Sequence, residues 1–185
     1  MQEKILVTGG AGFIGTHTVI ELIQAGHQVV VVDNLVNSNR KSLEVVERIT
    51  GVEVPFYEAD IRDTDTLRDI FKQEEPTGVI HFAGLKAVGE STRIPLAYYD
   101  NNIAGTVSLL KVMEENNCKK HHFQFFCDSL RRSSYSANLG RFPTFSDQSI
   151  RSYQTYARGN FDRYLQGRLR MECGLASLFQ PNRSS

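Results

Sequence analysis

The chain has 185 residues, enough for one domain and part of another, and its 41% hydrophobic content is enough for a packed core. The formal net charge is zero, no apolar run is long enough to span a membrane, and the start carries no signal-peptide pattern. Cys118, Cys127 and Cys173 form no paired framework. We therefore expect a cytoplasmic protein with reduced thiols and no membrane partner.

The first motif is a glycine-rich turn that follows the short apolar run Ile5–Val7. Its glycines are Gly9, Gly10, Gly12 and Gly15. In such a turn one glycine bends the chain tightly, one lets backbone N–H groups approach a pyrophosphate, and one lets the helix pack closely on the strand. A helix is predicted to begin here and to stop at Ala25-Gly26, and its first N–H groups would face the phosphates.

The next apolar run, Val29–Val32, has the continuous β-branched character of a strand buried on both faces, and Asp33 closes it. A carboxylate at this distance from a glycine turn is placed to hydrogen-bond a ribose hydroxyl. It would also repel a 2′-phosphate, so the pattern favours NAD over NADP. A plain structural turn is the alternative.

Strand and helix signals continue to alternate over the first two thirds of the chain. The predicted elements are a helix over Ser42–Ile49, a strand over Val52–Tyr57, a helix over Asp65–Gln73 capped by Asp63-Thr64, a strand over Gly78–Gly84 and a long helix over Pro95–Asn117. This order predicts an α/β fold, a Rossmann-like, doubly wound parallel sheet. The loops after the strands should share one rim, where such sheets bind ligands.

The pattern changes near Lys120. The stretch up to residue 118 holds 17 acidic and 10 basic residues, whereas the remainder holds 4 acidic and 11 basic ones. No lysine follows Lys120 and no valine follows Val112, although the first part has fifteen valines. Phe123, Phe125 and Phe126 can form one strand, but no sustained period continues beyond them. The sheet is therefore expected to be incomplete, and the last third has no assigned structure.

Several segments together carry a family resemblance. They are His81–Ser91, Asp33-Asn34-Leu35, Asp60-Ile61-Arg62 and Tyr98–Asn102. With the glycine turn, they resemble the UDP-glucose 4-epimerases of the extended short-chain dehydrogenase/reductase family, from residue 4 to about residue 120. We accordingly expect an NAD-binding domain over residues 1–120, and residues 121–185 show no family match in the frame as written.

The resemblance implies an isomerase of galactose metabolism that keeps NAD bound as a catalytic cofactor. The hexose C4 of a UDP-sugar would lose a hydride, giving a 4-keto sugar, and the hydride would return to the other face. UDP-glucose and UDP-galactose would be interconverted. A homodimer is an expectation only if the full-length protein is made, and the sequence leaves the oligomeric state open.

The resemblance also assigns cofactor-binding positions. They are Gly9, Gly12, Phe13, Ile14, Gly15, Asp33, Asn34, Asn37, Ser38, Asp60, Ile61, Phe82, Ala83, Gly84, Lys86 and Asn101. Simpler roles remain open for some of them: Phe13 and Ile14 can pack the first helix, and Lys86 can be an ordinary loop lysine. Asn101 can cap or bridge a helix and a loop.

The family's catalytic residues are not in place. A tyrosine acidified by a lysine four residues later takes the hydroxyl proton in this family, and a serine or threonine hydrogen-bonds the same hydroxyl. None of the seven tyrosines has lysine at that spacing; Tyr156, the nearest in position, is followed by Asn160. The expected Ser-Ser-Ser-Ala-Thr is replaced by Gln124–Asp128.

A shifted reading frame explains this break. Codons for His121–Asp128, read one base later, permit Ile-Ile-Phe-Ser-Ser-Ser-Ala-Thr. Codons for Ser177–Arg183 permit a second family-like segment, Arg-Tyr-Phe-Asn-Pro-Ile-Gly. We hypothesise a frameshift near Lys120, and the alternative is a genuine, divergent second domain with an Arg-rich surface.

Other features receive structural interpretations. Cys118, His121, His122 and Cys127 match no zinc spacing, so no metal is expected. The arginines of the last third lack a nucleic-acid recognition motif. His81 is predicted to be a hydrogen-bonded core residue. The alternative functions are another NAD-dependent nucleotide-sugar epimerase or dehydratase, and a catalytically inactive nucleotide-binding protein.

Overall fold

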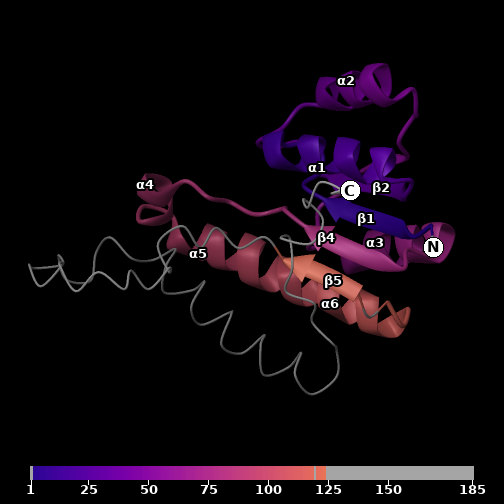
Figure 1. Cartoon of the computed structure of the whole chain (residues 1–185). Helices are drawn as coiled ribbons and strands as arrows, with labels where there is room; N and C mark the ends of the chain where they lie inside the picture. The colour runs from indigo at the N-terminus through magenta and orange to yellow at the C-terminus, as the bar shows by residue number, and fades with distance from the viewer. Residues whose placement is uncertain (1, 119, 124–185) are drawn as a thin grey trace, which may run out of the picture.

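The fold was determined as a computed structural model, which describes residues 2–118 and 120–123. Five parallel strands form one sheet in the order β3-β2-β1-β4-β5. The strands are β1 (Lys4–Thr8), β2 (Gln28–Asp33), β3 (Phe56–Glu58), β4 (Gly78–His81) and β5 (Lys120–Phe123). The longer helices are α1 (Phe13–Gln24), α2 (Lys41–Thr50), α3 (Thr64–Glu74) and α6 (Gly105–Glu115). The predicted Rossmann-like α/β fold is confirmed (Figure 1).

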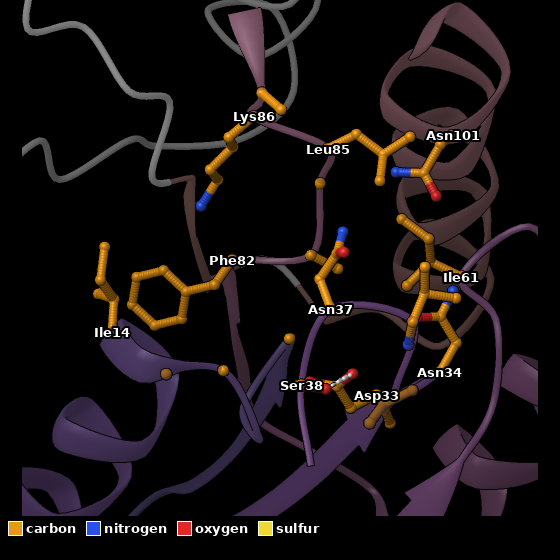
Figure 2. Close-up of a pocket in the computed structure, with 18 of the residues that line it drawn as sticks. Ile14, Asp33, Asn34, Asn37, Ser38, Ile61, Phe82, Leu85, Lys86 and Asn101 are labelled. Atoms are coloured by element: carbon orange, nitrogen blue, oxygen red, sulfur yellow. Dashed lines mark hydrogen bonds between the residues drawn. The ribbon is translucent and has the colours of Figure 1, made fainter. Parts of the chain in front are cut away.

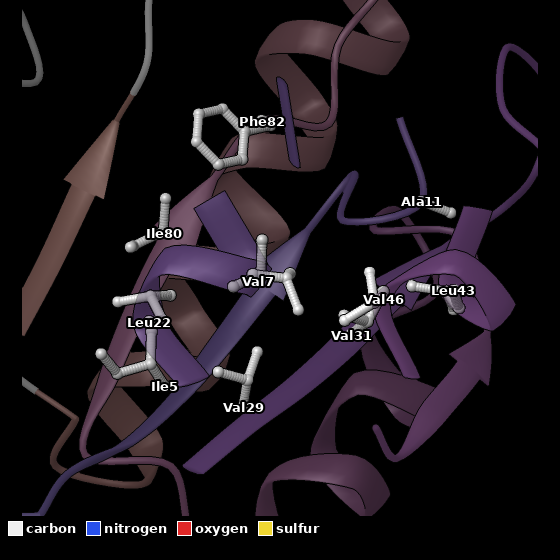
Figure 3. Close-up of a cluster of buried hydrophobic side chains, with 11 residues drawn as sticks. Ile5, Val7, Ala11, Leu22, Val29, Val31, Leu43, Val46, Ile80 and Phe82 are labelled. Atoms are coloured by element: carbon white, nitrogen blue, oxygen red, sulfur yellow. The ribbon is translucent and has the colours of Figure 1, made fainter. Parts of the chain in front are cut away.

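Side chains that alternate along the central strands build the two layers of the core. Ile5 and Val7 of β1 and Val31 of β2 point to one face, where α1 and α2 cover them (Figure 3). Leu6 and Val32 point to the other face and pack with α3 and α6. Burial on both faces explains the continuous apolar runs, because a polar side chain on either face would lose its water.

The chain order places a topological switch between β1 and β4. The chain runs from β1 outward through β2 to β3, and then returns to the other side of β1 to form β4 and β5. The register pairs Val7 with both Val31 and Ile80, so the three central strands end at the same level. The loops that leave these ends therefore diverge and open a crevice between them.

Two predicted strands are shorter in the structure. β3 begins at Phe56 rather than Val52, because Pro55 has no N–H for the ladder; its carbonyl still accepts from the Val31 N–H at 2.9 Å. β4 ends at His81, because the N–H groups of Phe82 and Ala83 both donate to the Thr8 carbonyl and bend the chain out of the sheet.

The predicted helix over Pro95–Asn117 contains a π-helical turn. α5 (Pro95–Tyr99) passes into a π-helical segment, η1 (Asp100–Ala104), and continues as α6. A short helix, α4 (Val88–Ser91), precedes this rod. Such π turns are rare and often lie at functional sites, because they realign the side chains around the inserted residue.

The fifth strand extends through the region where the sequence pattern changes. Lys120 and Phe123 pair in register with Gly78 and His81 of β4. Of the predicted aromatic strand, only Phe123 is described; Phe125 and Phe126 lie outside the described residues. Within the described part of the chain, no helix is both long and apolar enough to cross a bilayer.

Candidate functional site

A cleft of about 540 Å³ opens at the carboxyl ends of the strands, over the switch between β1 and β4. The predicted cofactor positions, except Asp60, all line it, and Figure 2 shows several of them converging on the opening. Its volume lies within the range of about 300–1,000 Å³ common to small-molecule sites. The loops that follow β1, β2, β3 and β4 all contribute residues to this cleft, as predicted for the ends of these strands.

The glycine loop forms the floor of the cleft by close backbone packing. Gly9 has φ +69°, and a Cβ there would lie 2.6 Å from the Ala83 nitrogen. A Cβ on Gly15 would meet the Gly9 carbonyl and lie 2.7 Å from the Gly10 Cα. At Gly12 only the Gly9 carbonyl oxygen is near, at 3.3 Å. Gly9 thus lets the loop pack against the backbone that follows β4, Gly15 lets the start of α1 pack against the loop, and Gly12 leaves room at the cleft.

The start of α1 is suited to an anion. Gly12 is its N-cap and supplies no side-chain acceptor, and no acidic residue lies in the first turn. The described hydrogen bonds give no protein acceptor to the N–H groups of Phe13 and Ile14, both of which line the cleft. Unpaired N–H groups at the positive end of a helix dipole bind phosphate groups.

Asp33 joins three parts of the cleft. Its Oδ2 accepts from the Ala11 N–H at 3.0 Å, and its Oδ1 accepts from the Leu35 N–H at 2.9 Å and the Ser38 hydroxyl at 2.7 Å. The residue is only 7% exposed. A carboxylate has about four acceptor positions, so three protein bonds leave capacity for one ligand hydroxyl.

Asp60 lies beside the cleft without lining it. Its carboxylate accepts from the Arg62 Nε at 2.9 Å, from Arg62 Nη2 at 2.7 Å and from Asn34 Nδ2 at 3.2 Å. The side-chain bonds from Arg62 hold the pKa of Asp60 down at about 2, despite partial burial. Arg62 also pairs with Asp100 at 2.5 Å, which ties this loop to η1, and Ile61 turns into the cleft.

The loop after β4 forms the opposite wall. Phe82 is buried and lines the cleft together with Ala83, Gly84 and Lys86. Figure 2 shows Phe82 and Lys86 in this wall. Desolvation lowers the pKa of the Lys86 ammonium from its ordinary value, although the side chain keeps contact with solvent. A cation in this wall complements the anion-binding start of α1 on the other side.

Asn102 holds this wall, and it was not among the predicted site residues. Its Oδ1 accepts from the Leu85 N–H at 2.8 Å, and its Nδ2 donates to the Leu85 carbonyl at 2.9 Å. Asn101, which lines the cleft, donates to the same Oδ1 at 2.8 Å. The Asn101-Asn102 pair was visible in the sequence, but its contacts were not. In the structure Asn102 bonds the loop after β4 directly, and Asn101 bonds Asn102.

Two described tyrosines have glutamates as partners. The Tyr57 hydroxyl donates to Glu74 Oε1 at 2.5 Å, and this bond raises the pKa of Tyr57 to about 12. The Tyr98 hydroxyl lies 2.7 Å from Glu90 Oε2 and 3.0 Å from the Ala87 carbonyl. The Glu74 carboxylate opposes ionisation of the Tyr57 phenol, so Tyr57 is not prepared to act as a base. Tyr156 and Gln124–Asp128 lie outside the described residues.

His81 is buried and hydrogen-bonded on both ring nitrogens, as predicted. Within residues 2–118 and 120–123, no group of three or more His, Cys, Asp or Glu side chains is arranged to hold a metal ion. The start of α1 and the Asp33 carboxylate together suit a ligand that carries both phosphate and hydroxyl groups.

The chain belongs to the NAD dependent epimerase/dehydratase family, whose model matches residues 5–129. The match continues past the expected domain boundary at residue 120, which remains a prediction. Within this family the chain is similar to UDP-glucose 4-epimerases. It is 60% identical over 111 residues to the enzyme of Haemophilus influenzae, an alignment that covers 60% of this chain and 33% of that protein.

Solved structures give the same relationship. One is UDP-glucose-4-epimerase from Stenotrophomonas maltophila with bound NAD and formylated UDP-arabinopyranose: TM-score 0.77, 34% identity, 90% of this chain and 50% of that chain. Another is UDP-glucose 4-epimerase from Bifidobacterium longum in complex with NAD+ and UDP: TM-score 0.76, 40% identity, 88% of this chain and 49% of that one. The chain thus spans a third to a half of the length of these relatives.

Proposed function

We propose that residues 2–123 form the NAD-binding part of a UDP-glucose 4-epimerase. The observation that carries this proposal is the convergence of the predicted cofactor positions, except Asp60, on one cleft at the β1–β4 switch. The bound ligands of the Stenotrophomonas and Bifidobacterium enzymes support it. The UDP named with both structures supports a UDP-sugar as the substrate of the full-length protein.

Each wall of the cleft has a place in this proposal. The start of α1 would hold the pyrophosphate, and the remaining acceptor position of Asp33 would hold a ribose hydroxyl. Asn34, Asn37, Ser38 and Ile61 would surround the adenosine side. Phe82, Lys86 and Asn101 would line the opposite wall. NAD, when bound, supplies hydride exchange at the sugar C4.

The 185-residue chain itself would bind the cofactor without turning over a sugar. It has no Tyr-x-x-x-Lys pair and no Ser-Ser-Ser-Ala-Thr segment, and Tyr57 and Tyr98 are engaged by glutamates. A frameshift near Lys120 accounts for the missing residues. This favours a catalytically inactive nucleotide-binding protein as the second candidate for the chain as written.

A second copy of the full-length protein is the proposed partner. Leu96 is 80% exposed, and Tyr99 and Val107 are each 38% exposed on the rod formed by α5, η1 and α6. Exposed apolar side chains on a helix support an interface with another helix. Analytical ultracentrifugation of a full-length protein with and without Leu96→Asp tests this assignment.

Isothermal titration of the purified chain with NAD tests cofactor binding. Gly12→Ala adds a methyl group at the cleft, with only the Gly9 carbonyl near it, so the fold should survive and affinity should fall by about tenfold or more. Gly89→Ala is the matched control, because a Cβ there meets nothing within 4 Å and Gly89 does not line the cleft. Equal NAD affinity for the two variants contradicts the proposed site.

A further inference from the structure

A buried hydrogen-bond network of polar side chains links β1, β4 and α6. The Thr8 hydroxyl, at the end of β1, lies 2.6 Å from His81 Nδ1, and His81 Nε2 lies 3.1 Å from the Thr106 hydroxyl on α6. The exposed fractions of Thr8, His81 and Thr106 are 0%, 6% and 2%. Polar groups buried this deeply are costly unless they are hydrogen-bonded, so the order of donors and acceptors is constrained.

The donors and acceptors of this hydrogen-bond network indicate which ring nitrogen of His81 carries a proton. The Thr106 hydroxyl donates its one proton to the Asn102 carbonyl at 2.6 Å. It must therefore accept from His81 Nε2, which carries the ring proton. In a ring with a single proton, His81 Nδ1 is then the acceptor for the Thr8 hydroxyl. For such a ring the geometry selects the Nε2–H tautomer.

The hydrogen-bond network continues from Thr106 to the wall of the cleft. Asn102 lies in the π turn η1, where the backbone bonds span five residues instead of four, and the Thr106 hydroxyl donates to the Asn102 carbonyl. The side chain of Asn102 in turn holds both the N–H and the carbonyl of Leu85. Leu85 precedes Lys86, and both line the cleft.

We propose that His81, as the Nε2–H tautomer, is a positioning residue that sets the backbone of Leu85 through Thr106 and Asn102. Thr8 directly precedes the glycine loop, so the same hydrogen-bond network couples the floor of the cleft to its opposite wall. The consequence for NAD affinity rests on the function proposed above; the positioning of Leu85 does not.

Hydrogen exchange on the full chain separates this role from general stability. Thr106→Val removes the hydroxyl and keeps the shape, whereas Thr106→Ser keeps the hydroxyl. We expect exchange of the Leu85 amide to accelerate about tenfold in Thr106→Val relative to the Leu6 amide, and to return toward the original rate in Thr106→Ser. Thr50→Val, which removes a helix-bonded hydroxyl at the end of α2, is the control. A parallel change at Leu6 and Leu85 overturns the proposal.

The tautomer is tested on the original chain. Nitrogen NMR of the ¹⁵N-labelled chain, with His81→Gln used to assign the ring signal, should show a protonated Nε2 and an unprotonated Nδ1. A protonated Nδ1 overturns the proposal, even if Thr106→Val fails to fold.

Affinity for NAD then distinguishes the two proposals. Weaker binding by about three- to tenfold in Thr106→Val, with Thr106→Ser near the original value, supports both. An original chain that binds no NAD but shows the selective exchange at Leu85 refutes the proposed function and leaves the positioning role supported.

Discussion

The N–H of Ala11 donates to Oδ2 of Asp33 at 3.0 Å and thereby joins the glycine loop to the end of β2. The sequence pattern assigns Asp33 a contact with a ribose, and the structure shows that its carboxylate also bonds the backbone of the glycine loop. The same carboxylate that would select the cofactor therefore contributes to the stability of the fold.

Asp33→Asn should lower the free energy of unfolding by about 1.5–3 kcal/mol. An amide group replaces one acceptor oxygen with a donor, so at least one of the three donors, of which the Ala11 N–H is buried, loses its partner. Urea denaturation measures the change. The control is Asp65→Asn, whose side chain is 92% exposed and should change stability by less than about 0.5 kcal/mol. Equal losses of unfolding free energy in the two variants would refute the contribution of the Asp33 hydrogen bonds to stability.

Gly9→Ala should cost more stability than Gly51→Ala. The two residues have similar φ angles, +69° and +72°, but a Cβ at Gly51 meets nothing within 4 Å, whereas at Gly9 it meets the backbone of Ala83. We expect a loss of about 1–2 kcal/mol for Gly51→Ala and at least about 3 kcal/mol for Gly9→Ala. Thermal and urea unfolding of both variants measure the difference in stability. Similar losses would show that the positive φ angle, and not the contact with Ala83, determines the cost of the substitution.

The Asp60–Arg62 pair should stabilise the protein in a defined pH range. The pKa of Asp60 is lowered from 3.8 to about 2 in the folded chain. Its contribution is therefore present above pH 3.8 and is lost as the pH falls through about 2. Unfolding of Asp60→Asn should depend less on pH across this range than that of the original chain. Asp69→Asn, an exposed carboxylate on α3, is the control; identical pH dependence in Asp60→Asn and the original chain would contradict the assignment.

Purified 185-residue protein should not convert UDP-galactose to UDP-glucose. Acid–base assistance is worth about 10² to 10⁴ in rate, and the residues that provide it in the family are absent. A coupled assay for UDP-glucose checks this, with a complete epimerase as the positive control. Measurable turnover by the chain as written would show that another residue supplies the base.

One inserted or deleted base near the Lys120 codon should restore a family-like sequence. The repaired frame should contain Ser-Ser-Ser-Ala-Thr almost at once and Tyr-x-x-x-Lys within about thirty residues, because serine and tyrosine must reach one sugar carbon from the same rim. Resequencing of the gene and an assay of the repaired protein test this. Confirmed bases without a long shifted frame would make residues 121–185 a genuine protein segment.

The sequence predicted the elements whose signals are local. The glycine spacing, the β-branched run before Asp33 and the cap at Asp63 each depend on neighbours in the chain. The Thr66 N–H does donate to Asp63 Oδ1, at 3.1 Å, as a cap requires. Burial on both faces made the central strands equally recognisable.

Features that depend on tertiary contacts could not be predicted in the same way. The role of Asp60 at the cofactor stays a prediction, and the bonds from Arg62 that hold its carboxylate beside the cleft could not be predicted from the sequence. Asn102 acts on Leu85, which is seventeen positions earlier in the sequence. The shortened β3 is different, because Pro55 was a visible signal against a longer strand.

The π turn changes the phase of the rod that runs from Pro95 to Glu115. A residue added within a helix rotates everything after it by about 100° relative to a regular helix. Tyr98, before the turn, faces Glu90 in α4, whereas Thr106, after it, faces His81 in the sheet. A deletion of one residue within Asp100–Ala104 would restore regular winding but separate these two surfaces. The irregular turn thus determines which side chains of the rod meet α4 and which meet the sheet.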